Sequence, residues 1–391
     1  MTPIVTAVAE PRPDGERIVK AIIELNGTFV DAAQITVKDR TITGCEQDGD
    51  IITLCLSEDD EQANVLPKFK KPAGGPGGPG GPKGPTGPGG PGKPKGHGPR
   101  IHPKNRRPIE VTADIPGVGE ITSSKAVEKV IDRFTQGRYG AFEYNLFTPD
   151  LTPGEKYPLV VFIADASANG PDVLVTLSQG IGATVWAEEE NQKKHPCYVL
   201  AIQIPIEIRL TDDNYNVVPE FDQIKELIDS IAEGNQVDRC RIYMTGQSQG
   251  CMATFEMNCR FPDLLAASMC VSGMWDPEKV GRLKNSRIYM GLSSGGLKEF
   301  PGMTAIADNL ERNGASVARI DLNYRDGWDI INEKIRNESI DANIVLAPFD
   351  KETVWDDDSS NHADIEHHSR GWELTYQAEA ARDWLFAWKK N

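Results

Sequence analysis

The middle of the chain contains the motif Gly246-Gln247-Ser248-Gln249-Gly250. The apolar run 241–245 precedes this motif, and a helical pattern of apolar residues follows it. In a G-x-S-x-G turn between a strand and a helix, the glycines let the chain turn so sharply that the serine hydroxyl stands alone above a sheet. The context therefore predicts that Ser248 is a nucleophile for acyl transfer. The alternative is a tight glycine turn with an incidental serine.

A serine nucleophile of this kind needs two N–H donors for the oxyanion that forms on the substrate. The residue after the nucleophile supplies one of them, which is Gln249 here. The second donor comes from a loop after an earlier strand, and the apolar run 158–163 leads into the small residues of 164–170. We expect the backbone of Ala166 to be this donor. We assign no catalytic role to the side chain of Asp165, because a carboxylate at this position is also typical of a residue that caps a loop.

The general base should be a histidine beyond the last strand. Of the six histidines, His97 and His102 lie in a low-complexity segment and His195 precedes an apolar run. The remaining candidates are His362, His367 and His368. The nearby Asp356, Asp357, Asp358 and Asp364 leave metal binding as an alternative, but their spacing matches no familiar ligand set. We therefore expect neither a metal nor a cofactor.

From about residue 122 the sequence alternates between short apolar runs and helical patterns. The expected strands are residues 158–163, 198–202, 241–245, 268–271, 287–291 and 343–346. The expected helices cover residues 221–232, a segment around 303–310, and 373–388. Such alternation predicts an α/β domain with a largely parallel sheet and helices on both faces. We assign this catalytic domain to residues 111–391.

Residues 1–66 are rich in β-branched runs separated by turn signals, which predicts a small β-sandwich-like domain. Residues 67–110 are expected to be a linker, because Gly and Pro repeat through much of this segment without an apolar face. The linker is basic, with Lys68, Lys70, Lys71, Arg106 and Arg107 among its cations. Its charge either keeps the tether soluble or docks it on the acidic body.

The composition excludes several classes of protein. A net charge of −16 argues against general affinity for nucleic acid, and the longest apolar runs are too short to cross a membrane. The seven cysteines include no CxxC pair, which predicts free thiols in a reducing compartment. Together with a first segment unlike a signal peptide, this predicts a cytoplasmic protein, or a secreted one if a leader has been removed.

Several motifs resemble those of bacterial α/β-hydrolases of the polyhydroxybutyrate-depolymerase and feruloyl-esterase branch, which are also labelled prolyl-oligopeptidase-family serine peptidases. The resemblance covers roughly residue 140 to the C-terminus. Its marks are residues 144–149, Gly182-Ala183-Thr184-Val185-Trp186-Ala187, 245–252, Phe261-Pro262-Asp263, 272–276, Pro301-Gly302-Met303 and 382–386. It implies an α/β-hydrolase fold, an immunoglobulin-like N-terminal domain and a small-molecule ester substrate, carbohydrate- or phenolic-linked in the feruloyl-esterase branch.

The resemblance also selects one histidine as the general base, and it implies that the usual acidic residue of the triad is missing. The family's histidine is followed by Trp and Tyr at intervals of four, as are His368, Trp372 and Tyr376. Relatives have Ser-Glu-Gly-Asp where this chain has Ser293-Ser294-Gly295-Gly296, so both acids are missing. Glu299 and Asp276 are the possible substitutes. Without a placed acid, we expect weakened activity that an acid introduced at Gly296 would raise.

These residues predict a serine esterase in which Ser248 attacks the acyl carbon and His368 moves the proton. The amides of Gln249 and Ala166 would hold the oxyanion. Two alternatives remain: a serine peptidase that uses the same machinery, and an impaired hydrolase fold that serves as a binding module.

Overall fold

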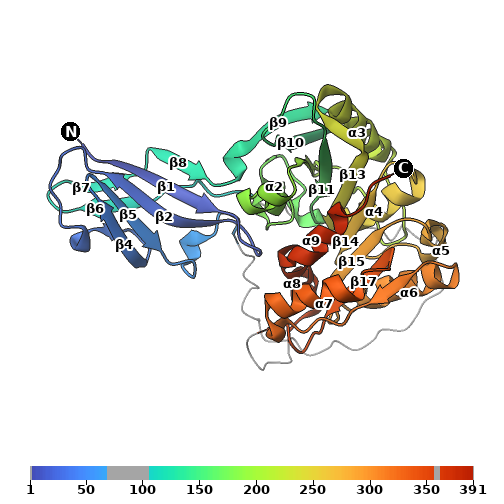
Figure 1. The fold of residues 1–391 in the computed structure, drawn as a ribbon. Helices are drawn as coiled ribbons and strands as arrows, with labels where there is room; N and C mark the ends of the chain where they lie inside the picture. Colours follow the sequence, from blue (N-terminus) through green and yellow to red (C-terminus); the bar gives the residue numbers. More distant parts are fainter. Residues whose placement is uncertain (1, 68–104, 356–361, 391) are drawn as a thin grey trace, which may run out of the picture.

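The computed structural model describes residues 2–67, 105–355 and 362–390 as a small β-lobe joined to a larger α/β lobe (Figure 1). A nine-stranded sheet runs through the larger lobe in the order β16-β17-β15-β14-β13-β11-β12-β10-β9. Pairing is parallel from β16 to β12, and β10 and β9 add an antiparallel edge. The strands are β9 (Phe134–Tyr139), β10 (Phe142–Phe147), β11 (Tyr157–Ile163), β12 (Tyr198–Gln203), β13 (Val237–Gln247), β14 (Ala267–Val271), β15 (Ile288–Ser293), β16 (Val317–Arg319) and β17 (Ile344–Phe349).

The six expected strands all overlap strands of this sheet. Every residue of β11, β12, β14, β15 and β17 is buried, because helices cover both faces of the sheet. The predicted α/β fold with a mostly parallel sheet is therefore confirmed. β9, β10 and β16 were not predicted, and all three lie at or next to an edge of the sheet.

The helices form two layers. One face of the sheet packs against α3 (Asp222–Gly234), α4 (Gln249–Arg260), α5 (Pro277–Val280) and α6 (Glu299–Arg312). The other face packs against α1 (Val175–Ser178), α7 (Trp328–Glu338), α8 (Asp364–Gln377) and α9 (Glu379–Phe386). The helix expected at 373–388 is in fact parts of α8 and α9, because the backbone of Ala378 is extended and ends α8.

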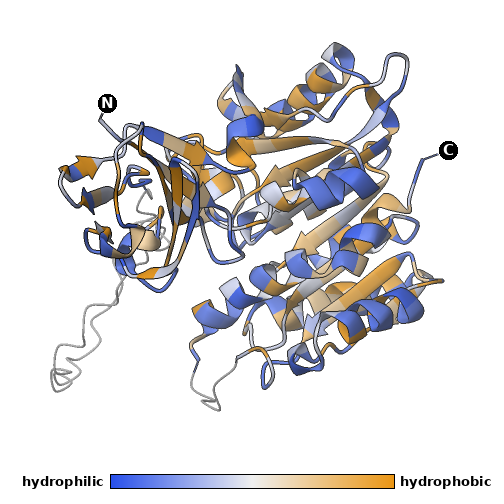
Figure 2. Ribbon diagram, turned by 60° about the vertical axis from the view of Figure 1, so that its left-hand side comes forward, coloured by the Kyte–Doolittle hydropathy of each residue, from blue (hydrophilic) through white to orange (hydrophobic). Residues whose placement is uncertain are grey.

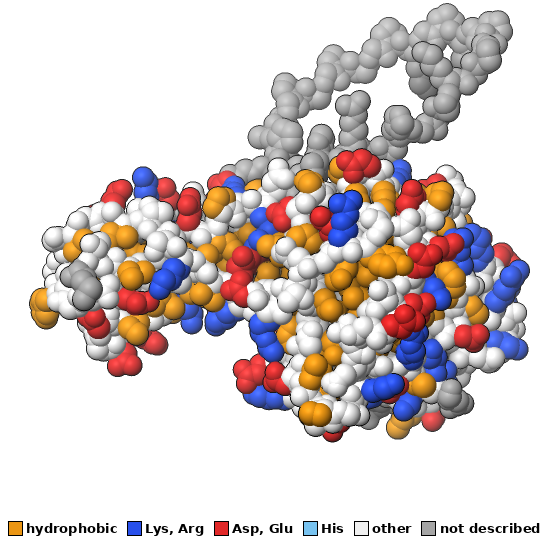
Figure 3. Space-filling model, turned by 90° about the horizontal axis from the view of Figure 1, so that it is seen from above, with side chains coloured by type: hydrophobic (Ala, Val, Ile, Leu, Met, Phe, Trp, Pro, Cys, Tyr) orange, Lys and Arg blue, Asp and Glu red, His pale blue; other side chains and the backbone are white. Residues whose placement is uncertain are grey.

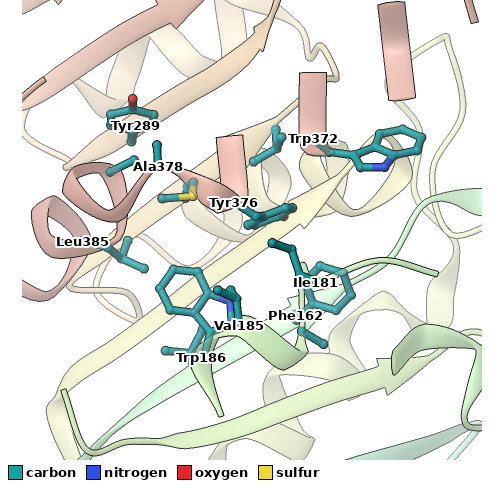
Figure 4. Close-up of a cluster of buried hydrophobic side chains, with 14 of the residues drawn as sticks. Phe162, Ile181, Val185, Trp186, Tyr289, Trp372, Tyr376, Ala378 and Leu385 are labelled. Atoms are coloured by element: carbon teal, nitrogen blue, oxygen red, sulfur yellow. The ribbon is translucent and has the colours of Figure 1, made fainter. Parts of the chain in front are cut away.

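Large side chains fill the space between the sheet and the second layer of helices. Figure 4 shows Phe162 from the sheet, Trp186 from a connecting segment and Tyr376 from α8 in one cluster. The rings of Phe162 and Tyr376 meet edge to face, with centroids 6.1 Å apart. In Figure 2 the sheet is largely hydrophobic and the outer sides of the helices are hydrophilic. This core fixes α8, the helix that carries His367 and His368.

The small lobe is a β-sandwich with one shared core. Its five-stranded sheet has the order β4-β5-β2-β1-β8, and its three-stranded sheet has the order β3-β6-β7. The strands are β1 (Ile4–Glu10), β2 (Arg17–Glu24), β3 (Thr36–Val37), β4 (Ile42–Asp48), β5 (Ile51–Leu56), β6 (Thr112–Ile115), β7 (Gly119–Thr122) and β8 (Lys125–Glu128). The predicted small β-domain is present, with a larger extent than expected.

The expected domain boundary at residue 111 is corrected by these strand pairs. β6 pairs with β3, and β8 pairs with β1, so residues 112–128 complete the small lobe instead of beginning the catalytic domain. Part of the expected linker is also packed: Arg106 forms ion pairs with Glu16 and Glu128, and Arg107 N donates to the carbonyl of Val65 at 2.8 Å. Lys68, Lys70, Lys71 and the Gly/Pro repeats lie outside the described residues.

Charges of both signs are interspersed over the face that Figure 3 shows. No helix in the described ranges is long and apolar enough to span a membrane. All seven cysteines lie in those ranges as free thiols, and Cys197, Cys251 and Cys270 are buried.

Candidate active site

Ser248 stands between β13 and α4 in a strained backbone conformation. β13 ends at Gln247 and α4 begins at Gln249, so one residue makes the whole turn. Its backbone angles are φ 53° and ψ −112°, outside the regions that residues with a side chain normally adopt. Such strain costs on the order of 1–3 kcal/mol and is common at active sites. The Ser248 amide donates to the carbonyl of Val271 at 3.0 Å, and the residue is partly exposed.

The two glycines of the motif allow close contact with the end of β11. A Cβ atom at Gly250 would lie 1.8 Å from the carbonyl oxygen of Ile163, and one at Gly246 would lie 2.6 Å from it. No side chain fits at either position. Because Ile163 is the last residue of β11, the loop that follows it starts directly beside Ser248.

Side chains of this loop and of Gln249 are hydrogen-bonded to each other. Ala166 begins a single 3-10 turn (Ala166–Ala168). Three residues beyond Ala166, the side chain of Asn169 accepts a hydrogen bond from Gln249 Nε2 at 3.0 Å. The first N–H groups of a helix have no acceptor within it, and the amide of Gln249 stands at the start of α4.

His368 and Glu299 meet beyond the carboxyl ends of the parallel strands. Nδ1 of His368 in α8 lies 2.5 Å from Oε1 of Glu299, the first residue of α6. Burial raises the pKa of Glu299, but the contact with His368 and the backbone N–H groups at the helix start outweigh it, so the pKa is below its ordinary value. The carboxylate is therefore ionised at neutral pH and lies beside the imidazole.

His368 and Ser248 both lie at the carboxyl ends of the parallel strands. One turn after His368 in α8, a Cβ atom at Gly371 would lie 2.3 Å from Oγ of Ser272. Ser272 follows Val271, whose carbonyl accepts the hydrogen bond from Ser248. The glycine at 371 thus lets α8 approach the strand next to the nucleophile turn.

The other acid that the sequence suggested has a different partner. Asp276 precedes α5, and its Oδ1 accepts a hydrogen bond from the amide of Glu278 at 3.0 Å. This is the ordinary role of an aspartate before a helix. Of the two acids, Glu299 is the one in contact with His368.

The two alternative histidines also have other partners. His367 Nδ1 lies 3.1 Å from Oγ of Ser293. The ring of His362 stacks on Trp355, with centroids 4.0 Å apart. No group of three or more His, Cys, Asp or Glu in the described part of the chain could hold a metal ion. Asp356, Asp357 and Asp358 lie outside the described residues.

A cleft of about 650 Å³ that was not predicted from the sequence is lined largely by residues of α8, and Ser248, His368 and Glu299 are not among its lining residues. At one wall, the ring of Trp372 lies edge-on to that of His368, with centroids 5.1 Å apart. Gln179, another lining residue, donates to Oγ of Ser167 in the loop of Ala166 at 3.0 Å. The rest of the lining comes from the small lobe and three segments of the large one: Pro13, Asp14, Tyr324, Trp355, Glu366, Ser369, Arg370, Glu373 and Gln377. No local sequence pattern predicts this cleft, because its lining residues are far apart along the chain.

No protein-family model matches the chain, and no curated protein matches it in sequence. Among solved structures, a thermostable esterase superposes with a TM-score of 0.72 and 20% identity, over 99% of this chain and 100% of its own. The acetyl xylan esterase of Aspergillus awamori has a TM-score of 0.37 and 15% identity, over 47% of this chain and 82% of its own. A feruloyl esterase module from Clostridium thermocellum has a TM-score of 0.36 and 12% identity, over 65% and 86%.

The latter two scores are too low to support an argument. The first similarity extends over the whole chain, but at 20% identity it defines the fold alone. That fold is of the α/β-hydrolase type found in esterases, preceded by a small β-domain.

Proposed function

We propose that the protein is a serine hydrolase that cleaves carboxylic esters through an acyl-enzyme on Ser248. The observation that carries the proposal is the 2.5 Å contact between Glu299 and His368, at the carboxyl end of the strands, where Ser248 forms a strained turn. A serine, a histidine and an oriented acid are the parts that acyl transfer needs.

In the proposed reaction, Ser248 Oγ attacks the ester carbonyl while His368 Nε2 accepts its proton. Glu299 holds the imidazole through Nδ1 and stabilises the imidazolium. The amides of Gln249 and Ala166 donate to the oxyanion. Collapse of the tetrahedral intermediate breaks the C–O bond, and the departing alcohol takes the proton from His368. Water, activated by His368, then releases the acid from Ser248 in the same two stages.

Trp372 lines the cleft and packs edge-on against His368, and we propose that a flat or ring-shaped group of the substrate reaches this cleft. Tyr324, Trp355 and Trp372 line it together with polar side chains. Aromatic surfaces with a few polar groups are typical of small-molecule sites, and they suit an ester linked to a sugar or a phenol. Peptide cleavage would use the same catalytic groups, but none of these contacts favours it. A binding module without activity is less well supported, because its rationale was the missing acid.

The proposal is tested by hydrolysis of p-nitrophenyl acetate and butyrate by the wild type and by Ser248→Ala, His368→Ala and His367→Ala. The first two variants should lose at least about 10⁴-fold in kcat, as such groups act as a unit. The matched control, His367→Ala, changes the neighbouring histidine and should stay within a few-fold of the wild type. Wild-type protein without turnover of either ester, or undiminished activity in Ser248→Ala, would overturn the proposal.

A further inference from the structure

Both variable positions of the nucleophile motif hold glutamines with buried side chains. Gln247 and Gln249 are 2% and 3% exposed, on either side of the partly exposed Ser248. Burying an amide is unfavourable unless its N–H and C=O groups find partners. The partners of these two glutamines lie in, or lead directly to, a single loop.

Gln249 pairs with Asn169 at one end of that loop. Gln249 Nε2 donates to Asn169 Oδ1 at 3.0 Å, and Asn169 Nδ2 donates back to Gln249 Oε1 at 3.4 Å. Asn169 is itself held, because its Nδ2 also donates to the carbonyl of Ile208 at 3.1 Å and its amide to that of Ala166 at 3.2 Å. The pair thus links the first residue of α4 to the end of the turn that Ala166 begins.

Gln247 reaches the other end of the loop through Gln179. Gln247 Nε2 donates to Gln179 Oε1 at 3.1 Å. Gln179 Nε2 then donates to Oγ of Ser167 at 3.0 Å and to the carboxylate of Asp165. Ser167 Oγ donates in turn to Asp165 at 2.8 Å. Asp165 is therefore a partner of this network.

We propose that Gln247 and Gln249 are positioning residues, which hold the loop of Ala166 so that its amide and that of Gln249 form a pre-organised oxyanion hole. This inference rests on the proposed function. Ala166 lies between the two attachment points, Asp165 and Ser167 on one side and Asn169 on the other. An oxyanion hole is effective because its donors are fixed before charge develops, so loosening the loop weakens transition-state binding more than substrate binding.

The test compares Gln249→Leu, Asn169→Leu and the double variant with the wild type. Leucine keeps the volume but removes the amide, so each single change leaves a partner unpaired. We expect each single variant to lower kcat about 10- to 100-fold with KM changed less than about threefold, since loss of a whole hole donor costs about 10²–10³. The double variant should lose less than the product of the two single losses. Gln249→Asn combined with Asn169→Gln, which restores an amide pair, should regain part of kcat.

Asn258→Leu is the matched control. Asn258 is a buried amide in the same helix, α4, and donates to Thr254 O and Ser268 Oγ, away from the loop. It should lower the melting temperature about as much as Gln249→Leu, without lowering kcat. A trifluoromethyl ketone, which forms a tetrahedral adduct with the serine, should bind the Gln249 and Asn169 variants more weakly in proportion to their loss of kcat/KM. Their pH profiles should match the wild type, because His368 and Glu299 are untouched.

Two negative results would have different meanings. If the wild type turns over esters and a fluorophosphonate labels Ser248, but the Gln249 and Asn169 variants keep full kcat or lose no more than Asn258→Leu, the positioning role is wrong and the proposed function stands. If folded wild type shows neither turnover nor labelling, the proposed function fails, and the positioning role fails with it.

Discussion

An acid stands at the start of two helices on the same face of the sheet, Asp276 just before α5 and Glu299 as the first residue of α6, and the two carboxylates have different partners. Asp276 accepts a hydrogen bond from its own helix, two residues further on. Glu299 reaches across to His368, in a helix on the opposite face of the sheet. Both acids sit where the helix dipole favours a negative charge. The comparison teaches that a helix start accommodates a carboxylate, whereas the element facing it decides whether that carboxylate can serve catalysis.

The largest expected effect that separates the two acids is on turnover. Glu299→Gln keeps the shape of the side chain but removes the charge that orients and stabilises the imidazolium. We expect kcat for p-nitrophenyl butyrate to fall about 10³- to 10⁴-fold, as in the best-studied triad. Asp276→Asn is the control and should keep its rate. The assignment of Glu299 as the acid would be wrong if Asp276→Asn lost activity and Glu299→Gln kept it.

A smaller loss of turnover is expected for Gly296→Asp, although the sequence alone suggested that this change would raise activity. A Cβ atom at Gly296 would lie 2.7 Å from Oε2 of Glu299, so the new carboxylate would crowd the acid already present. Like charges this close oppose each other's ionisation, and we expect kcat to fall roughly tenfold. Gly296→Ala is the steric control and should lose less. A rise in kcat for the Asp variant would mean that Glu299 does not serve His368.

Asp276 should contribute to stability instead of turnover. Asp276→Ala removes a helix cap, and we expect the free energy of unfolding to fall by about 1 kcal/mol. Urea unfolding at pH 7 measures this, and ester turnover of the same sample should be unchanged. A loss of activity without a loss of stability would contradict the capping role.

The smallest expected effect is the contribution of Glu299 to the pH dependence of the free energy of unfolding. Its pKa is lowered in the folded protein, so its ionised form stabilises the fold above the ordinary carboxyl pKa. This stabilisation is lost as the pH falls through the lowered pKa. The stability difference between wild type and Glu299→Gln, measured by urea unfolding, should therefore shift against the wild type between pH 7 and pH 3. A difference independent of pH would show that Glu299 is not selectively stabilised in its charged form.

The nine-stranded sheet could be predicted in large part from the sequence because its central strands are continuous apolar runs. The nucleophile turn could be predicted because its glycines are adjacent to Ser248. Residues 112–128 could not be assigned, since their strands are short and pair with strands beyond a long Gly/Pro segment. Pairing of this kind leaves no local pattern.

The identity of the acid that contacts His368 could not be predicted from the sequence either. The sequence named both Glu299 and Asp276, and neither spacing nor residue type could separate them. The choice depends on how closely α8 approaches the sheet, which Gly371 and Gly291 allow by leaving room for Ser272 and Thr375. The hydrogen-bond partners of Gln247 and Gln249 also could not be predicted, because Gln179 and Asn169 lie far from the motif in sequence.

The most direct test of the account is to map the adduct of a fluorophosphonate on the folded protein by peptide mass spectrometry. The account predicts a single adduct, on Ser248, that forms quickly in the wild type, much more slowly in Glu299→Gln, and at the wild-type rate in Asp276→Asn. Folding of each sample is checked by its melting temperature. No adduct on Ser248 in folded wild type, or equal rates in the wild type and Glu299→Gln, would contradict the claim that Ser248, His368 and Glu299 act together.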